Sequence, residues 1–416
     1  MRWLGILLCL LSATAHARPP RATADAVAQA IEDRYFDPAR GSAIAGELRT
    51  AAARGEFDAL HAPLDLAAAL GARLRPLDGH FNVRWSSPAG LAEGVPPPRR
   101  PPPAHDHGIR GVRILPGNIG YIDLAFFAHF EFADKAAPPR VAIDAALALL
   151  QWTDAVIIDL RGNGGGSPAM VGYLTSAFTQ KGADIYNRFS SREGSTSEAP
   201  LDWHPSPRLD VPLYVLTSGR TGSAAEALAY TLQSAGRALV VGERSGGAAN
   251  PGGPVEVGEG FSVFVSTGSP VNPLTGRNWE GVGVQPGLGV PAHDALHAAQ
   301  VHALQRRLAD GGAGPADTGA RWALEGLQAR DQPAAEVSAL AGTYGDVRIA
   351  VEDGALVMRQ GRRPPQVLRA LASGDFFVED DPLRRVAFAR DPAGVPVALD
   401  VHTADGNRNR FRRSAP

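Results

Sequence analysis

The fold is decided by the stretch PLYVLTSGRTGSAAEALAYTLQSAGRALVVGERSGGAAN, which runs from Pro212 to Asn250. Its apolar run Leu213–Leu216 has strand propensity, and Ala224–Leu232 combines strong helix formers with apolar residues at helical spacing. Glycines loosen the turn between these two runs, and a second apolar run and a Gly-rich loop follow the helix. The stretch therefore predicts a strand, a sharp turn, a helix, a strand and a loop, which is one unit of an α/β fold.

Ser223 stands where the predicted turn meets the predicted helix. Free backbone N–H groups at a helix N-terminus stabilise a developing oxyanion, so a nucleophile here would have part of an acyl-transfer site beside it. A structural role explains the same residue, because Ser223 and Glu226 form the S-x-x-E pattern of a capping box. This stretch by itself leaves both roles open.

A similar unit precedes this stretch. The run AVIIDL, Ala155–Leu160, is apolar and β-branched, as expected for a strand buried on both faces, and it leads into a loop in which glycines surround Asn163. Before it we expect paired strands over Val112–Leu115 and Ile119–Phe127 and a helix over Val141–Trp152. Repeated strand, loop and helix units predict an α/β fold with a mainly parallel sheet, whose loops at the strand ends carry the site.

The first seventeen residues, MRWLGILLCLLSATAHA, have the features of a secretory signal peptide. One basic residue precedes an apolar run, Trp3–Leu11, that is too short to span a bilayer, and Ala15 and Ala17 form a small-x-small cleavage site. Because Cys9 is the single cysteine, cleavage leaves a mature protein without disulfides, thiol nucleophiles or thiolate metal sites. We therefore expect a periplasmic or secreted protein.

The remaining segments predict a helical start, a linker and a β domain. Residues 21–77 are rich in Ala and Leu at helical spacing and end in LDGHFNVRW, a turn followed by a strand. A Pro-rich run, VPPPRRPPPAHDHG, comes next, and short alternating strands begin at Ser338. The predicted organisation is a signal peptide at 1–17, a helical subdomain at 18–86, a Pro-rich linker at 87–108, an α/β core at 109–308, a connector at 309–337 and an antiparallel β domain at 338–416.

Composition and motifs argue against several kinds of partner. The net charge of -2 gives no electrostatic reason to expect nucleic acid. The Gly-rich loop has Ser167 where a nucleotide fingerprint needs its third glycine, and His293 and His297 lack a matching carboxylate or cysteine set. We therefore expect no cofactor and no metal. Lys135 and Lys181 are the only lysines, which leaves few candidates for a catalytic amine.

A serine hydrolase needs a base, a carboxylate that orients it, and two oxyanion donors. His80, at the mouth of the turn Asp78–Gly79, could take the Ser223 proton, although a turn or core histidine would look the same. Glu280, in the corner NWE, could orient that base or form a surface salt bridge. The oxyanion donors would be the N–H groups of Ala224 and of Gly164 or Gly165.

Six ordered motifs, DGHFNV, GYIDL, IIDLRGNGGG, TSGRTGSAAE, VVGERSGG and NWEGVGVQP, cover roughly Asp78 to His297. Together they resemble the tail-specific or C-terminal processing serine protease family. The resemblance implies a core of crotonase-like ββα units, Ser223 as nucleophile, and an oxyanion hole from Ala224 and the Gly-rich loop. Since no PDZ-like stretch follows the linker, the chain is most similar to the branch that contains the modules of interphotoreceptor retinoid-binding protein.

The chain departs from many members of that family at one position. Those members use a Ser-Lys dyad with the lysine in a G-E-x-x-x-G-K-G stretch, where this chain has Ala248. The tricorn core protease, a relative without that lysine, uses a His from a segment similar to DGH and a Glu from one similar to NWEGVGV. The resemblance thus implies a triad of Ser223, His80 and Glu280, with Asp78 as the second choice for the orienting carboxylate.

These observations predict a serine endopeptidase that hydrolyses a peptide or an unfolded protein through an acyl-enzyme. One alternative is a non-catalytic module that binds a lipid or a peptide on the same scaffold. Esterase activity from the same triad is a third function that the sequence leaves open. The sequence leaves the physiological substrate and the oligomeric state open as well.

Overall fold

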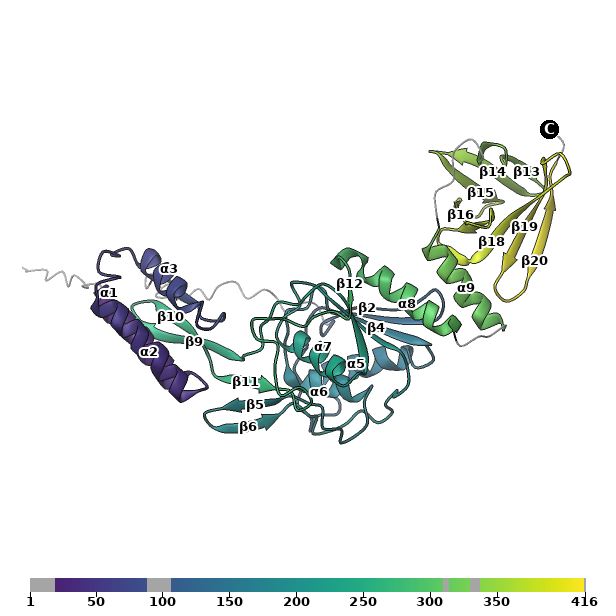
Figure 1. The fold of residues 1–416 in the computed structure, drawn as a ribbon. Coiled ribbons are helices and arrows are strands. Elements are labelled where there is room, and N and C mark those ends of the chain that lie inside the picture. Colours follow the sequence, from purple (N-terminus) through teal and green to yellow (C-terminus); the bar gives the residue numbers. More distant parts are fainter. Residues whose placement is uncertain (1–18, 88–105, 310–313, 330–336, 415–416) are drawn as a thin grey trace, which may run out of the picture. The chain divides into compact units, whose positions relative to one another are not determined.

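The computed structural model describes residues 19–87, 106–309, 314–329 and 337–414 (Figure 1). The predicted signal peptide and most of the predicted Pro-rich linker lie outside these ranges. Within them, no helix combines the length and the apolar character needed to cross a membrane. The chain forms two compact units, and two segments, Asn187–Ser197 and Ala248–Gly281, join the N-terminal residues in the first unit.

Three helices and two small sheets build the first unit. Each helix begins at a proline, a residue whose fixed φ and missing N–H suit the first helical position: α1 (Pro20–Arg34), α2 (Pro38–Ala53) and α3 (Pro63–Leu74). The helices pack on a sheet of order β1-β10-β9. Its strands are β1 (Val83–Trp85), β10 (Phe261–Ser266) and β9 (Gly252–Gly258). The second sheet consists of β11 (Gly268–Val271), β5 (Arg188–Ser191) and β6 (Gly194–Ser197).

Local sequence patterns do not reveal how this unit is assembled. The strand after the DGH turn pairs with β10, so that Val83 lies opposite Val263 across a separation of 180 residues. The hairpin of β5 and β6 was also not predicted, because Gly and Ser dominate it and all but one of its residues are exposed. Both features arise from pairing between distant segments, which local patterns do not encode.

The second unit contains a six-stranded sheet of order β12-β8-β7-β4-β3-β2. All its pairings are parallel except that of β2 with β3, so the predicted α/β core with a mainly parallel sheet is confirmed. Every residue of the central strands β4 and β7 is buried. In chain order the strands are β2 (Ile109–Leu115), β3 (Ile119–Leu124), β4 (Ala155–Asp159), β7 (Leu213–Thr217), β8 (Ala238–Gly242) and β12 (Leu288–Gly289).

Helices follow the strands of this sheet. The crossover helices are α5 (Pro138–Leu149), α6 (Pro168–Ser176) and α7 (Ala224–Ser234). A short 3-10 helix (Ala292–Asp294) leads into α8 (Ala295–Ala309), which packs on the sheet face that carries Tyr121, Ile157 and Tyr214. The helix α9 (Pro315–Leu327) extends the same apolar cluster.

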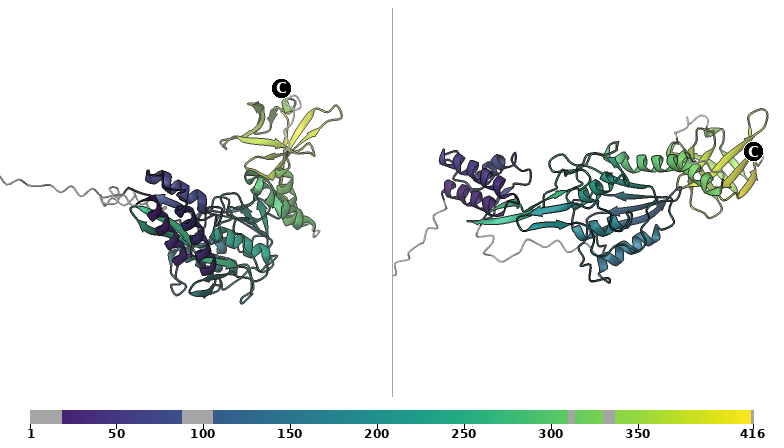
Figure 2. Two further views of the ribbon diagram at one scale, coloured as in Figure 1. Left: turned by 60° about the vertical axis from the view of Figure 1, so that its left-hand side comes forward. Right: turned by 60° about the horizontal axis from the view of Figure 1, so that its bottom comes forward.

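The C-terminal strands form a separate antiparallel domain, as predicted, with its own apolar core. Figure 2 shows that this sheet is strongly curved. Its first and last strands meet where Tyr344 bridges to Arg413 and the Gly345 N–H donates to the Arg412 carbonyl at 2.9 Å. The eight-stranded sheet therefore comes close to a barrel, with its first and last strands joined at one end only. Its strands are β13 (Gly342–Tyr344), β14 (Val347–Glu352), β15 (Ala355–Gln360), β16 (Gln366–Ala370), β17 (Phe376–Val378), β18 (Asp381–Arg390), β19 (Pro396–Thr403) and β20 (Arg408–Arg412).

Candidate active site

Ser223 occupies the turn between β7 and α7, with an exposed side chain. Its backbone has φ 52° and ψ −121°, a conformation that L-residues with a side chain rarely adopt. Such a conformation costs on the order of 1–3 kcal/mol and persists only where the surrounding structure enforces it, most often at functional sites. The Ser223 N–H donates to Glu226 Oε2 at 2.9 Å, so this half of the predicted capping box is present.

Glu226 does more than cap the helix. It is fully buried, and its Oε1 accepts hydrogen bonds from Ser245 Oγ at 2.5 Å and from the Gly247 N–H at 2.6 Å. Ser245 Oγ in turn accepts the Val284 N–H at 2.6 Å. A buried carboxylate with several donors therefore connects the Ser223 turn to the loop after β8. The sequence indicated only the capping contact, because the other donors are distant in the chain.

Asn163 organises the Gly-rich loop that faces this turn. Its side chain is fully buried, accepts the Gly165 N–H at 2.8 Å and donates to the Leu124 carbonyl at 2.9 Å. Its backbone carbonyl accepts the Gly222 N–H at 3.0 Å, which joins the loop to the turn before Ser223. We did not single out Asn163 as a site residue from the sequence, although an amide among glycines is a usable signal for a side chain that holds a loop.

The Gly-rich loop packs directly against the turn that carries Ser223. A Cβ placed on Gly165, whose φ is +119°, would lie 2.8 Å from the Ser223 Cβ and 3.1 Å from the Ala224 nitrogen. The Gly165 N–H is already bonded to Asn163. Within the described ranges, no acceptor is found for the N–H groups of Gly164 and Ala224. Of the two loop glycines, Gly164 is therefore the one with an N–H left for an oxyanion.

His80 belongs to the first unit and follows the turn after α3. Its Nδ1 lies 3.1 Å from Glu280 Oε1 and 3.3 Å from Asp78 Oδ1, and its ring stacks on Phe264 with centroids 6.0 Å apart. The structure therefore brings His80 together with both carboxylates that the sequence analysis considered as its orienter. Because both face Nδ1, Nε2 is the ring nitrogen that this cluster does not use.

Backbone donors hold Glu280 in place. Its Oε2 accepts the N–H groups of Ala249 and Asn250 at 2.8 and 3.0 Å, which leaves Oε1 for His80. Since the carboxylate is anchored through one oxygen, the other has a defined direction.

Asp78 is held more completely than Glu280. Its Oδ2 accepts the Tyr35 hydroxyl at 3.1 Å and the Ser266 hydroxyl at 2.9 Å, and its Oδ1 accepts the His80 N–H at 2.9 Å. Burial opposes ionisation, yet the hydrogen bonds from His80 and Ser266 lower the pKa of Asp78 to about 2. Asp78 is therefore a buried carboxylate that stays charged at neutral pH.

The two carboxylates have a strong effect on the histidine. The hydrogen bond to Asp78, and next the one to Glu280, raise the pKa of His80 to about 10, against the opposing effect of burial. His80 in this arrangement is an imidazolium at neutral pH. Asp78, His80 and Glu280 also have the spacing of a metal site, with candidate ligand atoms within 4.8 Å of one another. A protonated Nδ1 satisfies these distances without an ion.

Comparison with known proteins identifies the core. Residues 118–290 match the model of peptidase family S41. These residues form a peptidase S41 domain. The match includes Ser223, Glu280 and the Gly-rich loop, and it confirms the resemblance to C-terminal processing proteases.

Individual relatives of the S41 domain are distant. Over 189 residues the chain is 27% identical to the carboxy-terminal-processing protease of Bartonella bacilliformis; the match covers 42% of this chain and spans 39% of that protein. A solved candidate peptidase from Parabacteroides merdae superposes with a TM-score of 0.52 at 19% identity, covering 72% of this chain and all of that one. The photosystem II D1 C-terminal processing protease gives a TM-score of 0.45 at 17% identity, covering 66% and 94% of the two chains.

The unit that contains most of the S41 domain holds a Ser-His-Glu array of its own, which the sequence did not indicate. Ser167 Oγ lies 2.9 Å from His129 Nδ1, and His129 Nε2 lies 2.8 Å from Glu131 Oε1. Ser167 already caps α6 by accepting the Ala169 N–H, and the residue after it is Pro168, which has no N–H to offer an oxyanion. The histidine and glutamate side chains are 65% and 80% exposed. This array therefore lacks the donors and the burial that acyl transfer needs.

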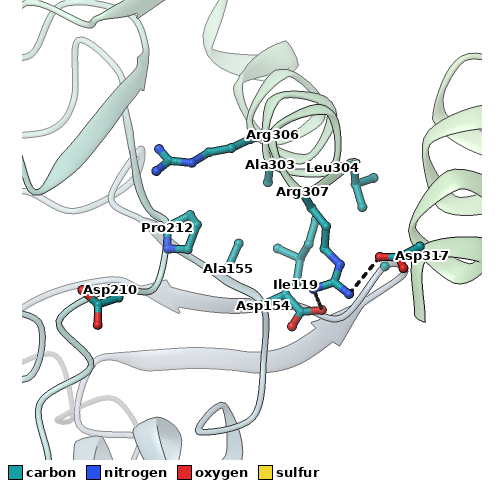
Figure 3. A pocket seen from close by; sticks show the side chains of 11 residues that line it. Ile119, Asp154, Ala155, Asp210, Pro212, Ala303, Leu304, Arg306, Arg307 and Asp317 are labelled. Atoms are coloured by element: carbon teal, nitrogen blue, oxygen red, sulfur yellow. Dashed lines mark hydrogen bonds and ion pairs between the residues drawn. The ribbon is translucent and has the colours of Figure 1, made fainter. Parts of the chain in front are cut away.

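A pocket of about 390 Å³ lies at the end of the six-stranded sheet where strands β3 and β4 begin (Figure 3). Ile119 and Ala155, at the starts of their strands, line it, whereas Ser223 and the Gly-rich loop follow strand ends. Figure 3 shows Arg307 of α8 between two carboxylates, 3.2 Å from Asp154 and 3.3 Å from Asp317 of α9. We interpret this pocket as a structural feature of the packing between the six-stranded sheet, α8 and α9.

Proposed function

We propose that this protein is a periplasmic or secreted serine endopeptidase that cleaves peptides or unfolded proteins through an acyl-enzyme on Ser223. The observation that carries the proposal is the strained backbone of Ser223, with the unbonded N–H groups of Ala224 and Gly164 beside it. A serine that served only as a helix cap would not need this conformation. The S41 domain and the protease named among its relatives support the same conclusion.

In the proposed reaction, His80 Nε2 takes the proton of Ser223 Oγ as the hydroxyl attacks the peptide carbonyl. Glu280, assisted by Asp78, stabilises the imidazolium through Nδ1. The N–H groups of Ala224 and Gly164 bind the oxyanion of the tetrahedral intermediate. His80 then protonates the leaving amine, and a water molecule hydrolyses the acyl-enzyme in the reverse sequence of proton transfers.

The location of the protein is part of the proposal. The predicted signal peptide at residues 1–17 and the absence of cysteine after Cys9 support export to an oxidising compartment. N-terminal sequencing of the exported protein would test this, with a new N-terminus at Arg18 as the expected result.

The decisive experiment compares three proteins on a loosely folded substrate such as casein, with products identified by mass spectrometry. We expect wild type and Ser167→Ala to cut at the same sites, because Ser167 is a helix cap. Ser223→Ala should be slower by about 10³-fold or more, since it lacks the nucleophile. Cleavage by Ser223→Ala at the wild-type rate, or its loss in Ser167→Ala, would overturn the assignment.

One observation keeps a non-catalytic alternative open. With its pKa raised to about 10, His80 is already protonated at neutral pH and does not accept the Ser223 proton there. A module that binds a lipid or a peptide without cleaving it would not need a neutral histidine. Two results together would favour this alternative. Ser223→Ala would bind a peptide as tightly as the wild type, and the wild type would cleave no substrate between pH 7 and pH values at which His80 is neutral, about 10 and above.

A further inference from the structure

A cavity of about 360 Å³ lies beside His80 in the first unit. A volume of this size is at the small end of ligand pockets and suits one amino-acid side chain. The imidazole of His80, the proposed catalytic base, lines this cavity, so an occupant would contact the histidine that the proposed reaction uses. The lining residues are His80, Asn82, Arg84, Pro254, Ser262 and Phe264.

The alternation of the strands explains why these side chains meet. Along β10, Phe261, Val263 and Val265 are buried in the core under the helices, so Ser262 and Phe264 point to the opposite face of the sheet. The same alternation on β1 buries Val83, and Arg84 lies opposite Ser262 in the antiparallel register. The cavity is therefore built on the face of this sheet that the helices leave open.

The chemistry of the walls is specific. Arg84 is the only permanently charged lining residue, and among the described residues no carboxylate lies within ion-pair distance of it. With its amide oxygen turned toward Arg84, Asn82 accepts from Nε at 3.2 Å and from Nη2 at 3.3 Å, which steadies the guanidinium. Ser262 adds a hydroxyl donor, and Phe264 and Pro254 supply apolar surface.

We propose that this cavity receives a carboxylate of the bound peptide, carried by an acidic side chain or by the chain terminus, next to the bond that is cleaved. The proposal rests on the proposed function for its catalytic meaning, and on the cavity alone for its binding chemistry. A guanidinium with free donors recognises a carboxylate in a planar, bidentate manner. The apolar walls accommodate the short stem of Asp or Glu.

Neighbouring acidic groups do not contradict this assignment. Asp78 and Glu280 are committed to His80 Nδ1 and do not line the cavity. Glu256 stands on the same sheet face, opposite Ser262, but lies outside the lining. The cavity lining thus offers an entering carboxylate the Arg84 guanidinium and the His80 imidazolium, and it contains no acidic residue.

The test measures peptide binding to the full-length Ser223→Ala variant by fluorescence anisotropy, so that cleavage is not required. The probes are pools of labelled, acetylated peptide amides with a central Glu, Gln or Lys and uncharged residues elsewhere; a Gln pool with a free terminal carboxylate is the fourth. We expect the Glu pool, the free-carboxylate pool, or both to bind about fivefold more tightly than the Gln amide pool. Salt should reduce this preference, because Arg84 is exposed.

Variants of Arg84 then decide whether the cavity is responsible. Arg84→Gln should abolish the preference, and Arg84→Glu should transfer it to the Lys pool, whereas Arg73→Gln, an exposed arginine on α3, is the matched control. Equal binding of all four pools, or a preference that survives Arg84→Gln, would overturn the inference. If wild type cleaves nothing but the Arg84-dependent preference is found, the cavity assignment stands and the proposed peptidase activity falls. If the wild type cleaves substrates but shows no Arg84-dependent preference, the proposed peptidase activity stands and the cavity assignment falls.

Discussion

At Ser223 the backbone conformation and the side chain have opposing requirements. The positive φ of 52° favours glycine, whereas acyl transfer requires the hydroxyl. Serine at this position makes the turn less stable than glycine would. The hydrogen bonds of Glu226 and Asn163 around the turn stabilise it. The cost of that choice can be measured.

We expect Ser223→Gly to be more stable than Ser223→Ala by about 1 kcal/mol, because glycine relieves the strain that alanine retains, less the entropy that glycine loses on folding. Urea unfolding of the two inactive variants measures the difference. Equal midpoints would mean that the turn is not strained in solution.

The carboxylate pair on His80 predicts an unusual pH dependence. The base must be neutral, so kcat/KM of the wild type should rise with pH toward the His80 pKa of about 10. Asp78→Asn removes the larger of the two stabilising contacts, so the rise should shift to lower pH. A pH–rate profile measures the shift, and an unchanged profile would show that Asp78 does not act on His80.

Glu280→Gln separates orientation from charge. It should lower the His80 pKa as Asp78→Asn does, but it should also reduce the maximal kcat by about 10³-fold or more, because the group that selects the tautomer is lost. If both variants reduce kcat equally, the two carboxylates share the orienting role.

The same pKa shift affects stability. Because the folded-state pKa of His80 is raised from 6.5 to about 10, its contribution is fully present below pH 6.5 and is lost as the pH rises through 10. We expect the melting temperature of Ser223→Ala to fall over this range, and to fall less when Asp78→Asn is added. If the melting temperature falls equally in both proteins, titratable groups other than His80 cause the fall.

At the scale of elements, the Gly-rich loop after β4 and the turn before α7 form one structure. A Cβ on Gly165 would meet the Ser223 Cβ at 2.8 Å, so Gly165→Ala must displace either the loop or Ser223. We expect a loss of activity of about 10²-fold or more, since small displacements of reacting groups have effects of this size. Gly219→Ala is the control, because a Cβ there meets no atom within 4 Å. Full activity of Gly165→Ala would show that the loop is not part of the site.

At the scale of the whole molecule, the nearly closed β barrel has an apolar core of its own, whereas α9 shares the apolar cluster of the six-stranded sheet through Ala320 and Ala323. We therefore expect a chain that ends at Ala329 to keep the stability and activity of the S41 domain. A chain that ends at Ala309 loses α9 and should unfold at a lower temperature, because Leu304 becomes exposed. Thermal unfolding and casein cleavage compare the two truncations. Loss of activity on removal of the barrel alone would give the barrel a role in catalysis.

Much of this architecture was predictable because it is local. The strand, turn and helix around Ser223 and the Gly-rich loop after β4 lie within short windows whose propensity and spacing indicate their structure. The separate β domain was predictable for the same reason, since alternation within each strand requires no knowledge of its partner. The candidate residues Ser223, His80 and Glu280 came from ordered motifs, and their joint role in catalysis remains a prediction.

Only the tertiary structure showed what depends on contacts between distant segments. The sequence made Asp78 the second choice after Glu280, whereas in the structure both carboxylates contact Nδ1 of His80. It left Gly164 and Gly165 equivalent, and the side chain of Asn163 distinguishes them by engaging one N–H. The local elements and the residues that they carry follow from short windows of the sequence. Folding decided which of those residues share a proton or an N–H group, because a hydrogen bond depends on positions in space and not on separation along the chain.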